Sequence, residues 1–333
     1  MWRAVCCEVQ GIGHKKANVP CQDKTFKLMK NGVYVIALAD GAGTSNLSHY
    51  GAERIVHDMS EYLVNHFVDL ISCNDGRKVK KNLVDLFRVI LLNEAEIHKC
   101  NIHDLASTLL LAAVHENHFI LLHIGDGVIG YLDEGNLKVA SKPDNGEFSN
   151  VTTFVTSSEV LSSMRLFKGE LKNVDAFVLM SDGTEYSLYH KPSNKLADVI
   201  KRLMHRTCLI DNNVLTAQLT DSFNAVISKN TQDDCSIAIL ARTSKVLCPI
   251  EALSLNERMK LYGIERFVHC AKRRAFRYDT ILKLTKESRS PKQIARSIHL
   301  KPKYAKKQVE KLVLLGLLIK KQGNYQNIQY LNK

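Results

Sequence analysis

Three stretches of the sequence share one arrangement, an apolar run of strand type that ends in Asp-Gly. They extend from Val33 to Gly41, from Phe119 to Gly127 and from Phe177 to Gly183. Each run is short and bounded by Gly, Asp or Asn, which is typical of a buried strand. Each arrangement places a carboxylate where a strand leaves the core, beside a Gly that lets the backbone turn tightly. A fourth segment, Gln232-Asp233-Asp234, precedes an apolar run from Cys235 to Leu240.

Helical segments separate these strands. Apolar residues recur at helical spacing in Gly51–Ser72, and a second helix is predicted directly after it at Lys78–Lys99. Further helices are predicted at Asn194–Thr207 and Asn213–Lys229, and one more buried strand at Thr108–Val114. Because two helices follow one another between strands, the pattern favours an α+β fold over a doubly wound parallel sheet.

The carboxylates at the strand ends indicate a kind of chemistry. Carboxylates gathered at one rim repel one another and raise their pKa values unless cations neutralise them. Oxygen ligands without a Cys or His cluster select hard ions, Mg²⁺ or Mn²⁺. Two such ions bridged by an aspartate suit hydrolysis of a phosphate ester, because they activate water and neutralise the phosphoryl group. Ordinary turn chemistry would also explain any one Asp-Gly taken alone.

Seven ordered blocks of sequence match a known family. They are Gly11–His14 with Pro20–Asp23, Ala39–Gly43, Ser107–Leu110, Ile124–Asp126, Asn145–Asn150, Met180–Gly183 and Asp233–Ser236. On these blocks, which cover roughly residues 1–242, the chain resembles the metal-dependent serine/threonine protein phosphatases of the type 2C family, and within it a bacterial subgroup. The resemblance implies a four-layer αββα sandwich of two antiparallel sheets flanked by helices. It also implies a centre of two Mg²⁺ or Mn²⁺ ions, with a looser third ion in bacterial members.

The resemblance further implies roles for the residues that match the family's metal centre. Asp40 resembles the carboxylate that bridges the two metals, and Gly41 resembles the residue whose backbone carbonyl is a ligand. Asp182 and Asp233 resemble ligands of the first metal.

Two further carboxylates have weaker roles by the same resemblance. Asp23 resembles the aspartate that supports the waters on the metals, so it is grouped with Asp40 as catalytic. Asp126 resembles the residue that, together with Asp182, holds the third ion. Asp234 is expected to support the ligand residues without binding a metal itself, or to shape the turn.

The predicted substrate site departs from the family pattern. Many members carry an Arg before the first aspartate motif to grip the substrate phosphate, whereas this sequence has Asn18 there. His14, Lys15 or Lys16 could bind the phosphate instead, although a lone cation does so less specifically than the planar fork of Arg. For the lysines, a solvated charged loop is the other interpretation.

Charge divides the chain into two parts. The 333 residues carry a net charge of +12, and residues 270–333 hold 17 Lys and Arg against three acidic residues. This basic end follows a near-neutral body, which marks a composition boundary. We therefore predict a catalytic domain at residues 1–245, a connecting helix or linker at 246–270 and a basic domain at 271–333.

The basic segment has the pattern of a small winged helix-turn-helix domain. Helices are predicted at Asp279–Glu287, at Pro291–Ile298 behind a Ser290 cap and at Pro302–Leu315, followed by a hairpin of Leu317–Lys321 and Ile328–Leu331 around Gly323-Asn324. The presumed recognition helix carries five lysines, Lys301, Lys303, Lys306, Lys307 and Lys311. Such a helix would meet DNA phosphates, but winged helices also serve as protein docking modules, so DNA and a docked protein both stay open.

The leading hypothesis is metal-dependent hydrolysis of phosphoserine and phosphothreonine on proteins, with a basic targeting or regulatory domain. Its partners would be a phosphorylated protein and a cognate Ser/Thr kinase. The alternative is a DNA-binding regulator whose phosphatase-like domain senses a phosphorylated partner. No apolar run approaches the length of a membrane span, no secretory signal is evident, and the nine cysteines form no Cys-x-x-Cys pair. We therefore expect a cytoplasmic protein without a membrane partner.

Overall fold

The computed structural model describes residues 2–144, 152–210, 212–243, 254–264, 270–315 and 317–327. The chain divides into two compact units, residues 1–207 with 212–242, and residues 243–333 with 208–211. The motif at 145–150 and the strand predicted at 328–331 lie outside the described residues. Among the helices that are described, none has the length and apolar character that crossing a membrane requires.

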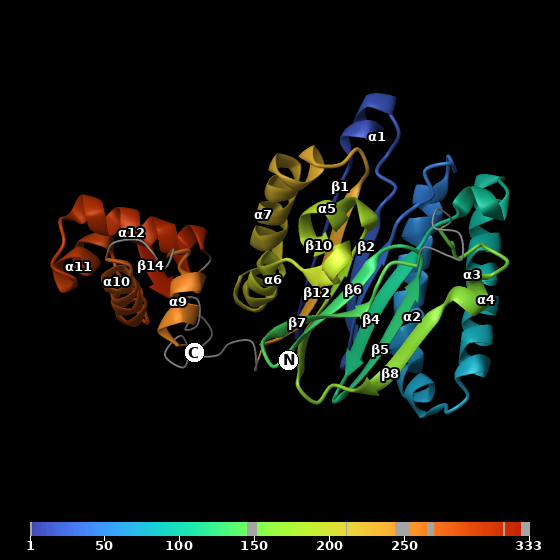
Figure 1. The fold of residues 1–333 in the computed structure, drawn as a ribbon, viewed down its shortest axis with the longest axis horizontal. Coiled ribbons are helices and arrows are strands. Elements are labelled where there is room, and N and C mark those ends of the chain that lie inside the picture. The colour runs from blue at the N-terminus through green and yellow to red at the C-terminus, as the bar shows by residue number, and fades with distance from the viewer. Residues whose placement is uncertain are drawn as a thin grey trace. The chain divides into compact units, whose positions relative to one another are not determined.

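Two five-stranded antiparallel sheets form the body of the first unit (Figure 1). One sheet has the order β1-β12-β9-β6-β7, which are Trp2–Val9, Cys235–Arg242, Val174–Met180, Val128–Asp133 and Asn136–Ser141. The other has the order β2-β3-β4-β5-β8, which are Lys24–Lys30, Val33–Ala39, Leu109–His115, His118–Ile124 and Arg165–Glu170. The five buried strands predicted from the sequence are confirmed as β3, β4, β5, β9 and β12.

Burial on both faces explains the continuous apolar sequence of the central strands. In β3, Val35 and Ala37 pack in the core beneath the helices, whereas Ile36 and Leu38 lie in the core between the two sheets. Successive side chains of a strand point to opposite faces, so a strand that is covered on both sides has no position for a polar residue.

Helices cover the outer faces of the sheets (Figure 1). The second sheet is covered by α2 (Ser48–Ser72) and α3 (Gly76–His98), whose apolar stripes join the core of β3, β4 and β5. On the other side α7 (Asn212–Ala225) packs against β1, beside α6 (Asp198–Leu209). The unit is therefore an α+β sandwich of two antiparallel sheets between helices, as predicted.

Short elements complete the unit and correct two predicted boundaries. They are α1 (Ile12–Ala17), α4 (Val160–Ser163), α5 (Glu185–Leu188), β10 (Tyr189–His190), β11 (Lys195–Leu196) and 3₁₀ turns at Ile102–Leu105, Asp182–Thr184, Lys191–Ser193 and Ile227–Lys229. The helix predicted at 194–207 begins later, because Lys195 and Leu196 pair with β10. The helix predicted at 213–229 ends at Ala225, before the last of these 3₁₀ turns.

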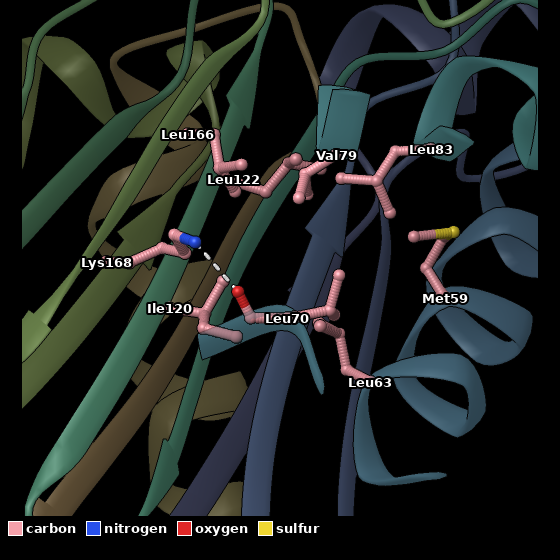
Figure 2. Close-up of a pocket in the computed structure, with 9 residues that line it drawn as sticks. All are labelled: Met59, Leu63, Leu70, Val79, Leu83, Ile120, Leu122, Leu166 and Lys168. Carbon is pink, nitrogen blue, oxygen red and sulfur yellow. Dashed lines mark hydrogen bonds between the residues drawn. The ribbon is translucent and has the colours of Figure 1, made fainter. Parts of the chain in front are cut away.

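A small apolar cavity lies between α2, α3 and the strands β5 and β8 (Figure 2). It is lined by Met59, Leu63, Leu70, Val79, Leu83, Ile120, Leu122, Leu166 and the stem of Lys168. The Lys168 ammonium donates to the carbonyls of Leu70 at 2.8 Å and Cys73 at 2.5 Å, at the end of α2. This lysine therefore stabilises a helix C-terminus, where the last carbonyls have no partner within the helix.

The second unit contains four described helices and a hairpin. They are α9 (Leu255–Leu261), α10 (Ala271–Leu284), α11 (Pro291–Ser297), α12 (Pro302–Leu314), β13 (Leu318–Lys321) and β14 (Asn324–Asn327). The predicted cap of α11 is confirmed, since the Ser290 hydroxyl accepts from the Gln293 backbone N–H at 3.3 Å. The hairpin turn lies at Gln322-Gly323, both with positive φ, one residue before the predicted turn.

The helix predicted at 279–287 was placed too late. It begins at Ala271, because Ala271, Ala275, Tyr278 and Ile281 form a buried stripe at helical spacing. The described part of the predicted linker, residues 254–264 and 270, also includes the helix α9. Tyr262, which directly follows α9, is fully buried, and its hydroxyl donates to Asp279 of α10 at 2.5 Å. The described residues of α9 therefore pack with α10 in one core.

Candidate metal centre

Strand directions explain why the predicted carboxylates meet. Asp40 follows β3 and Asp126 follows β5, and both strands flank β4 in antiparallel pairing. The C-terminal ends of β3 and β5 therefore lie at the same rim of their sheet. The Asp40 backbone N–H donates to the Thr108 hydroxyl at 2.9 Å, and the Thr108 N–H donates to the Asp40 carbonyl at 2.8 Å. These two bonds hold the Asp40 turn against the start of β4.

The other sheet supplies Asp182 and Asp233. Asp182 follows β9 and Asp233 precedes β12, its antiparallel neighbour, so the two residues lie at one end of the pair. Gly183 packs so closely on the carbonyl of Asp234 that a Cβ at Gly183 would lie 1.9 Å from that oxygen. Only Gly permits this approach, which brings Asp182 next to the turn that carries Asp233.

Asp126 occupies a turn with unusual backbone geometry. Gly125 has a φ of +104°, and a Cβ there would lie 2.4 Å from the Thr108 methyl group. The Asp126 carboxylate accepts a hydrogen bond from the Thr152 hydroxyl at 2.6 Å. The Gly125 carbonyl lies 2.8 Å from Nε2 of the buried His123.

Three of the predicted ligands form a cluster. Carboxylate oxygens of Asp40, Asp126 and Asp182 all lie within 4.8 Å of one another, and no other such group of His, Cys, Asp or Glu occurs among the described residues. Burial, and then the negative charges of Asp23 and Asp182, raise the pKa of Asp40 well above its ordinary value. Burial, followed by the charges of Asp126 and Asp233, raises the pKa of Asp182 to about 7. The structure therefore places Asp233 beside the cluster, although outside its tightest group.

Asp23 is the most enclosed of these carboxylates. Burial raises its pKa to about 8, while the hydroxyls of Ser236 and Ser181 lower it. Neither carboxylate oxygen makes a hydrogen bond of good geometry within the described residues. Uncompensated buried carboxylates are costly, and a divalent cation would compensate them. The donor set of carboxylate oxygens fits Mg²⁺ or Mn²⁺.

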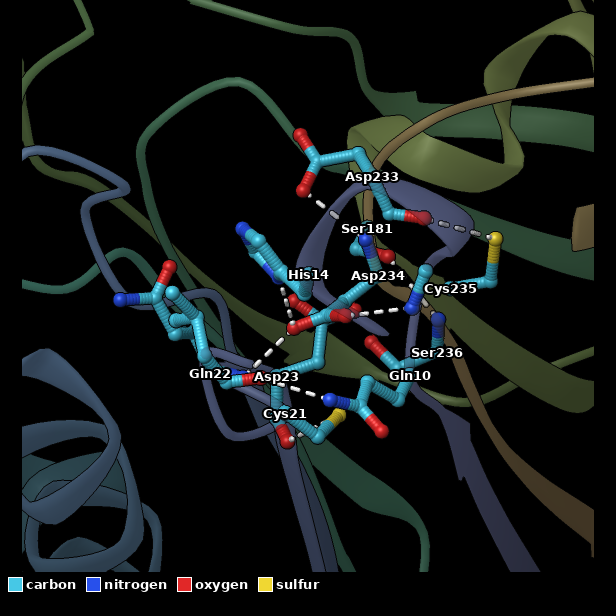
Figure 3. Close-up of polar contacts among 12 residues, drawn as sticks. Gln10, His14, Cys21, Gln22, Asp23, Ser181, Asp233, Asp234, Cys235 and Ser236 are labelled. Atoms are coloured by element: carbon cyan, nitrogen blue, oxygen red, sulfur yellow. Dashed lines mark hydrogen bonds and ion pairs between the residues drawn. The ribbon is translucent and has the colours of Figure 1, made fainter. Parts of the chain in front are cut away.

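The residues predicted to bind phosphate lie on α1, and two of them have partners. His14 Nδ1 lies 2.9 Å from the Asp234 carboxylate (Figure 3), and the Lys15 ammonium donates to Asn224 at 3.3 Å. Lys16 is exposed. Asp234, which the sequence predicts to support the ligands or to shape the turn, is buried and accepts hydrogen bonds from Gly11 and Gln22. Nothing in the sequence separates it from an ordinary turn aspartate, because its partners are distant backbone groups.

Four of the five lysines predicted to bind nucleic acid are exposed on or beside α12, namely Lys301, Lys303, Lys306 and Lys307. Lys311 is different. Its ammonium donates to the Gly263 carbonyl at 3.5 Å and lies 5.9 Å from the centre of the Tyr278 ring. Burial lowers the pKa of Lys311. This lysine packs within the C-terminal unit instead of extending from it.

Comparison with known proteins identifies the family to which the first unit is similar. Residues 10–224 match the family model described as Protein phosphatase 2C, a range that includes Asp23, Asp40, Asp126 and Asp182 and ends before Asp233. The chain is 29% identical over 185 residues to serine/threonine-protein phosphatase 3 of Escherichia coli strain K12, which covers 53% of this chain and 72% of that protein.

Solved structures resemble about three quarters of the chain. A sex determining protein of C. elegans aligns with 73% of this chain and 66% of its own length, with a TM-score of 0.52 and 11% identity, which is a likeness of fold alone. The serine/threonine phosphatase Stp1 of Staphylococcus aureus aligns with 72% of this chain and 95% of its own, with a TM-score of 0.47 and 14% identity. Because the family model spans more than half of the residues, the chain belongs to the protein phosphatase 2C family and is a serine/threonine protein phosphatase.

Proposed function

We propose that this chain hydrolyses phosphoserine and phosphothreonine on proteins at a two-metal centre held by Asp40, Asp182 and Asp233. The observation that carries the proposal is the cluster of Asp40, Asp126 and Asp182, in which burial and neighbouring negative charges raise the pKa values of Asp40 and Asp182. The Gly41 carbonyl would complete the ligand set, and Asp126 with Asp182 would hold a third ion. Mg²⁺ or Mn²⁺, when bound, would lower the pKa of water and neutralise the charge of the phosphate.

The protein's own groups have separate tasks in this proposal. Asp40 lies at the end of β3. Burial and the neighbouring carboxylates oppose its ionisation, and a bound cation would compensate its negative charge. Asp23, buried and without a hydrogen bond of good geometry among the described residues, would accept a hydrogen bond from water and so orient it. The exposed Lys16, with Lys15, would attract the substrate phosphate as a cation without the geometry of an Arg fork.

The test is release of phosphate from a phosphoserine peptide. With Mn²⁺ present, Asp40→Asn should reduce turnover by at least about 100-fold, because a bridging ligand loses its charge. Asp85→Asn, at an exposed carboxylate of α3, is the matched control and should retain activity. Equal hydrolysis by the wild-type protein in excess EDTA would refute the metal centre.

The lysines of α1 have their own test. Lys15→Ala combined with Lys16→Ala should raise KM more than it lowers kcat, as expected when binding common to the ground and transition states is lost. Lys78→Ala combined with Lys81→Ala removes two exposed charges from α3 and serves as the control. Unchanged kinetics of the α1 variant would show that its lysines contact only solvent and do not bind the substrate phosphate.

We also propose that the basic C-terminal unit contains a winged-helix-like domain that targets the phosphatase to nucleic acid. Three helices precede a hairpin, and Arg289, before α11, pairs with Tyr325 of β14 as a third strand would. The exposed lysines of α12 supply the charge, and Tyr304 beside them is 60% exposed. Because α9 packs with α10, we place the start of this domain near residue 254 and not at 271.

The full chain can test this targeting. If four to six phosphates are contacted, duplex binding should weaken with salt at a log–log slope of roughly −4 to −5. Lys303→Ala combined with Lys307→Ala should reduce the slope by up to about two units and leave phosphatase turnover on a small ester unchanged. The Lys78 and Lys81 double variant is again the control. Absence of duplex binding near 50 mM salt, with a protein recovered instead, would favour a docking module.

A further inference from the structure

We propose that Asp234 is a positioning residue that holds three segments of the metal centre together, and that His14 contacts Asp234 and is not a phosphate ligand. This inference rests on the proposed metal centre. It concerns a residue next to the proposed ligand Asp233. The side chain of Asp234 contacts the N-terminal loop at Gly11 and Gln22 (Figure 3).

One buried carboxylate closes the loop between β1 and β2. The Asp234 side chain is 1% exposed, and its two oxygens accept backbone N–H groups from Gly11 at 2.6 Å and Gln22 at 2.5 Å. These two donors lie at the two ends of the loop that carries α1. Gln22 directly precedes Asp23, so the contact fixes where the Asp23 carboxylate enters the site. Hydrogen bonds to an ionised, buried acceptor are among the strongest in proteins.

The same contact reaches the Asp40-Gly41 turn through one residue. The Gln22 N–H donates to Asp234 and the Gln22 carbonyl accepts the backbone N–H of Gly41 at 3.2 Å, so the backbone of Gln22 links Asp234 to that turn. On the opposite side, Gly183 packs against the backbone of Asp234. Displacement of Asp234 would therefore move residues beside Asp23, Asp40 and Asp182 together. Groups that hold metal-binding residues in position act in this way, and their loss typically weakens metal binding 10–100-fold.

His14 is engaged in the same network. Its Nδ1 lies 2.9 Å from Asp234, and its side chain is 20% exposed. Rotation of the imidazole toward a substrate phosphate would break this contact between His14 Nδ1 and the buried Asp234 carboxylate. Lys15 and Lys16 are not constrained in this way, because both are exposed. The geometry therefore argues against His14 as a phosphate ligand, whereas the two lysines stay available for that role.

Binding of Mn²⁺ alone, measured by calorimetry on the full chain, tests the proposal without relying on activity. Asp234→Asn preserves shape but places an amide N–H₂ group against a backbone N–H, so Mn²⁺ should bind at least about 10-fold more weakly. Turnover of a phosphopeptide should fall at saturating Mn²⁺ while KM changes little. Mn²⁺ affinity within about threefold of wild type would overturn the positioning role. Failure of the wild type to bind Mn²⁺ would instead reject the proposed metal centre.

His14→Ala keeps the proposal testable if Asp234→Asn does not fold. We expect weaker Mn²⁺ binding, by about threefold or more, with an unchanged inhibition constant for inorganic phosphate. A phosphate ligand predicts the reverse, about 10-fold weaker inhibition by phosphate at unchanged Mn²⁺ affinity, and that result would overturn the assignment. Asp85→Asn should match wild type in both measurements.

Discussion

Raising the pH from 5 to 8 should destabilise the catalytic unit when no divalent cation is present. Burial and mutual repulsion raise the pKa values of Asp182 to about 7 and Asp23 to about 8 in the folded protein. Between pH 4 and 8 the folded chain therefore binds more protons than the unfolded chain, whose carboxyls are already ionised. Under this condition the free energy of unfolding falls as the pH rises.

The size of the effect follows from Asp182. Its pKa is about 7, against an ordinary value of 3.8. Linkage for one such group gives a loss of about 2.5 kcal/mol in the free energy of unfolding between pH 5 and 8. For a unit of this size that corresponds to roughly 5–10 °C in melting temperature. Asp23 acts in the same direction, but the two carboxyls interact, so their contributions do not add simply.

The chain offers a selective probe for this measurement. Trp2 is its single tryptophan, and it is buried between the two sheets with the Arg242 guanidinium 5.2 Å from its ring centre. Fluorescence unfolding curves therefore report the catalytic unit and not the C-terminal one. Saturating Mn²⁺ should abolish the loss at pH 8, because a cation replaces the protons that the carboxylates otherwise need.

Two variants separate the cause from general pH effects. Asp182→Asn should remove much of the pH dependence and make the metal-free protein more stable at pH 8 than wild type. Asp85→Asn should leave the wild-type curve unchanged. Metal-free stability that is constant or rises from pH 5 to 8, or a wild-type slope in Asp182→Asn, would refute the argument that these carboxylates are crowded and uncompensated.

Three further variants follow from close contacts. Gly183→Ala would place a Cβ against the Asp234 carbonyl, so Mn²⁺ affinity should fall at least about 10-fold by calorimetry, more than for an equivalent change at the open Gly76. Lys168→Met removes the donor to two carbonyls at the end of α2 and should lower the free energy of unfolding by about 1–2 kcal/mol in denaturant titrations. Tyr262→Phe leaves Asp279 without its hydroxyl partner, so the C-terminal unit should lose about 1–2 kcal/mol while phosphatase turnover stays unchanged, as circular dichroism and a phosphopeptide assay can show.

The strands that sequence reasoning found are the most buried ones. β3, β4 and β5 are apolar along most of their length because both faces are covered, so their pattern is visible without tertiary information. The edge strands β1, β2, β7 and β8 were missed, and so was the interior strand β6. Lys24–Lys30 has Lys at every third position and remains partly exposed, which dilutes its strand signal. β6 is short and contains Gly130 among its buried residues, which interrupts its apolar run.

The same distinction applies to the site. Asp40, Asp126 and Asp182 could be found because each directly follows a buried strand, and local sequence places them at a rim. The roles of Asp234 and Lys311 depend on contacts with residues that are far away in the chain. A lysine on a basic helix and an aspartate in a turn look the same in sequence whether they face solvent or a partner. Only the tertiary arrangement separates the two cases.

The position of β12 has a consequence for how the protein is made. It is the last strand of the catalytic unit to leave the ribosome, yet it lies between β1 and β9 inside its sheet. Until residues 235–242 emerge, β1 and β9 each present an unpaired edge that could associate with other nascent chains. Asp233 and Asp234 arrive with the same strand. A chain interrupted before this point would therefore be prone to aggregate and, under the proposed function, would lack one ligand of its metal centre, so hydrolysis would begin only after the whole unit has been synthesised.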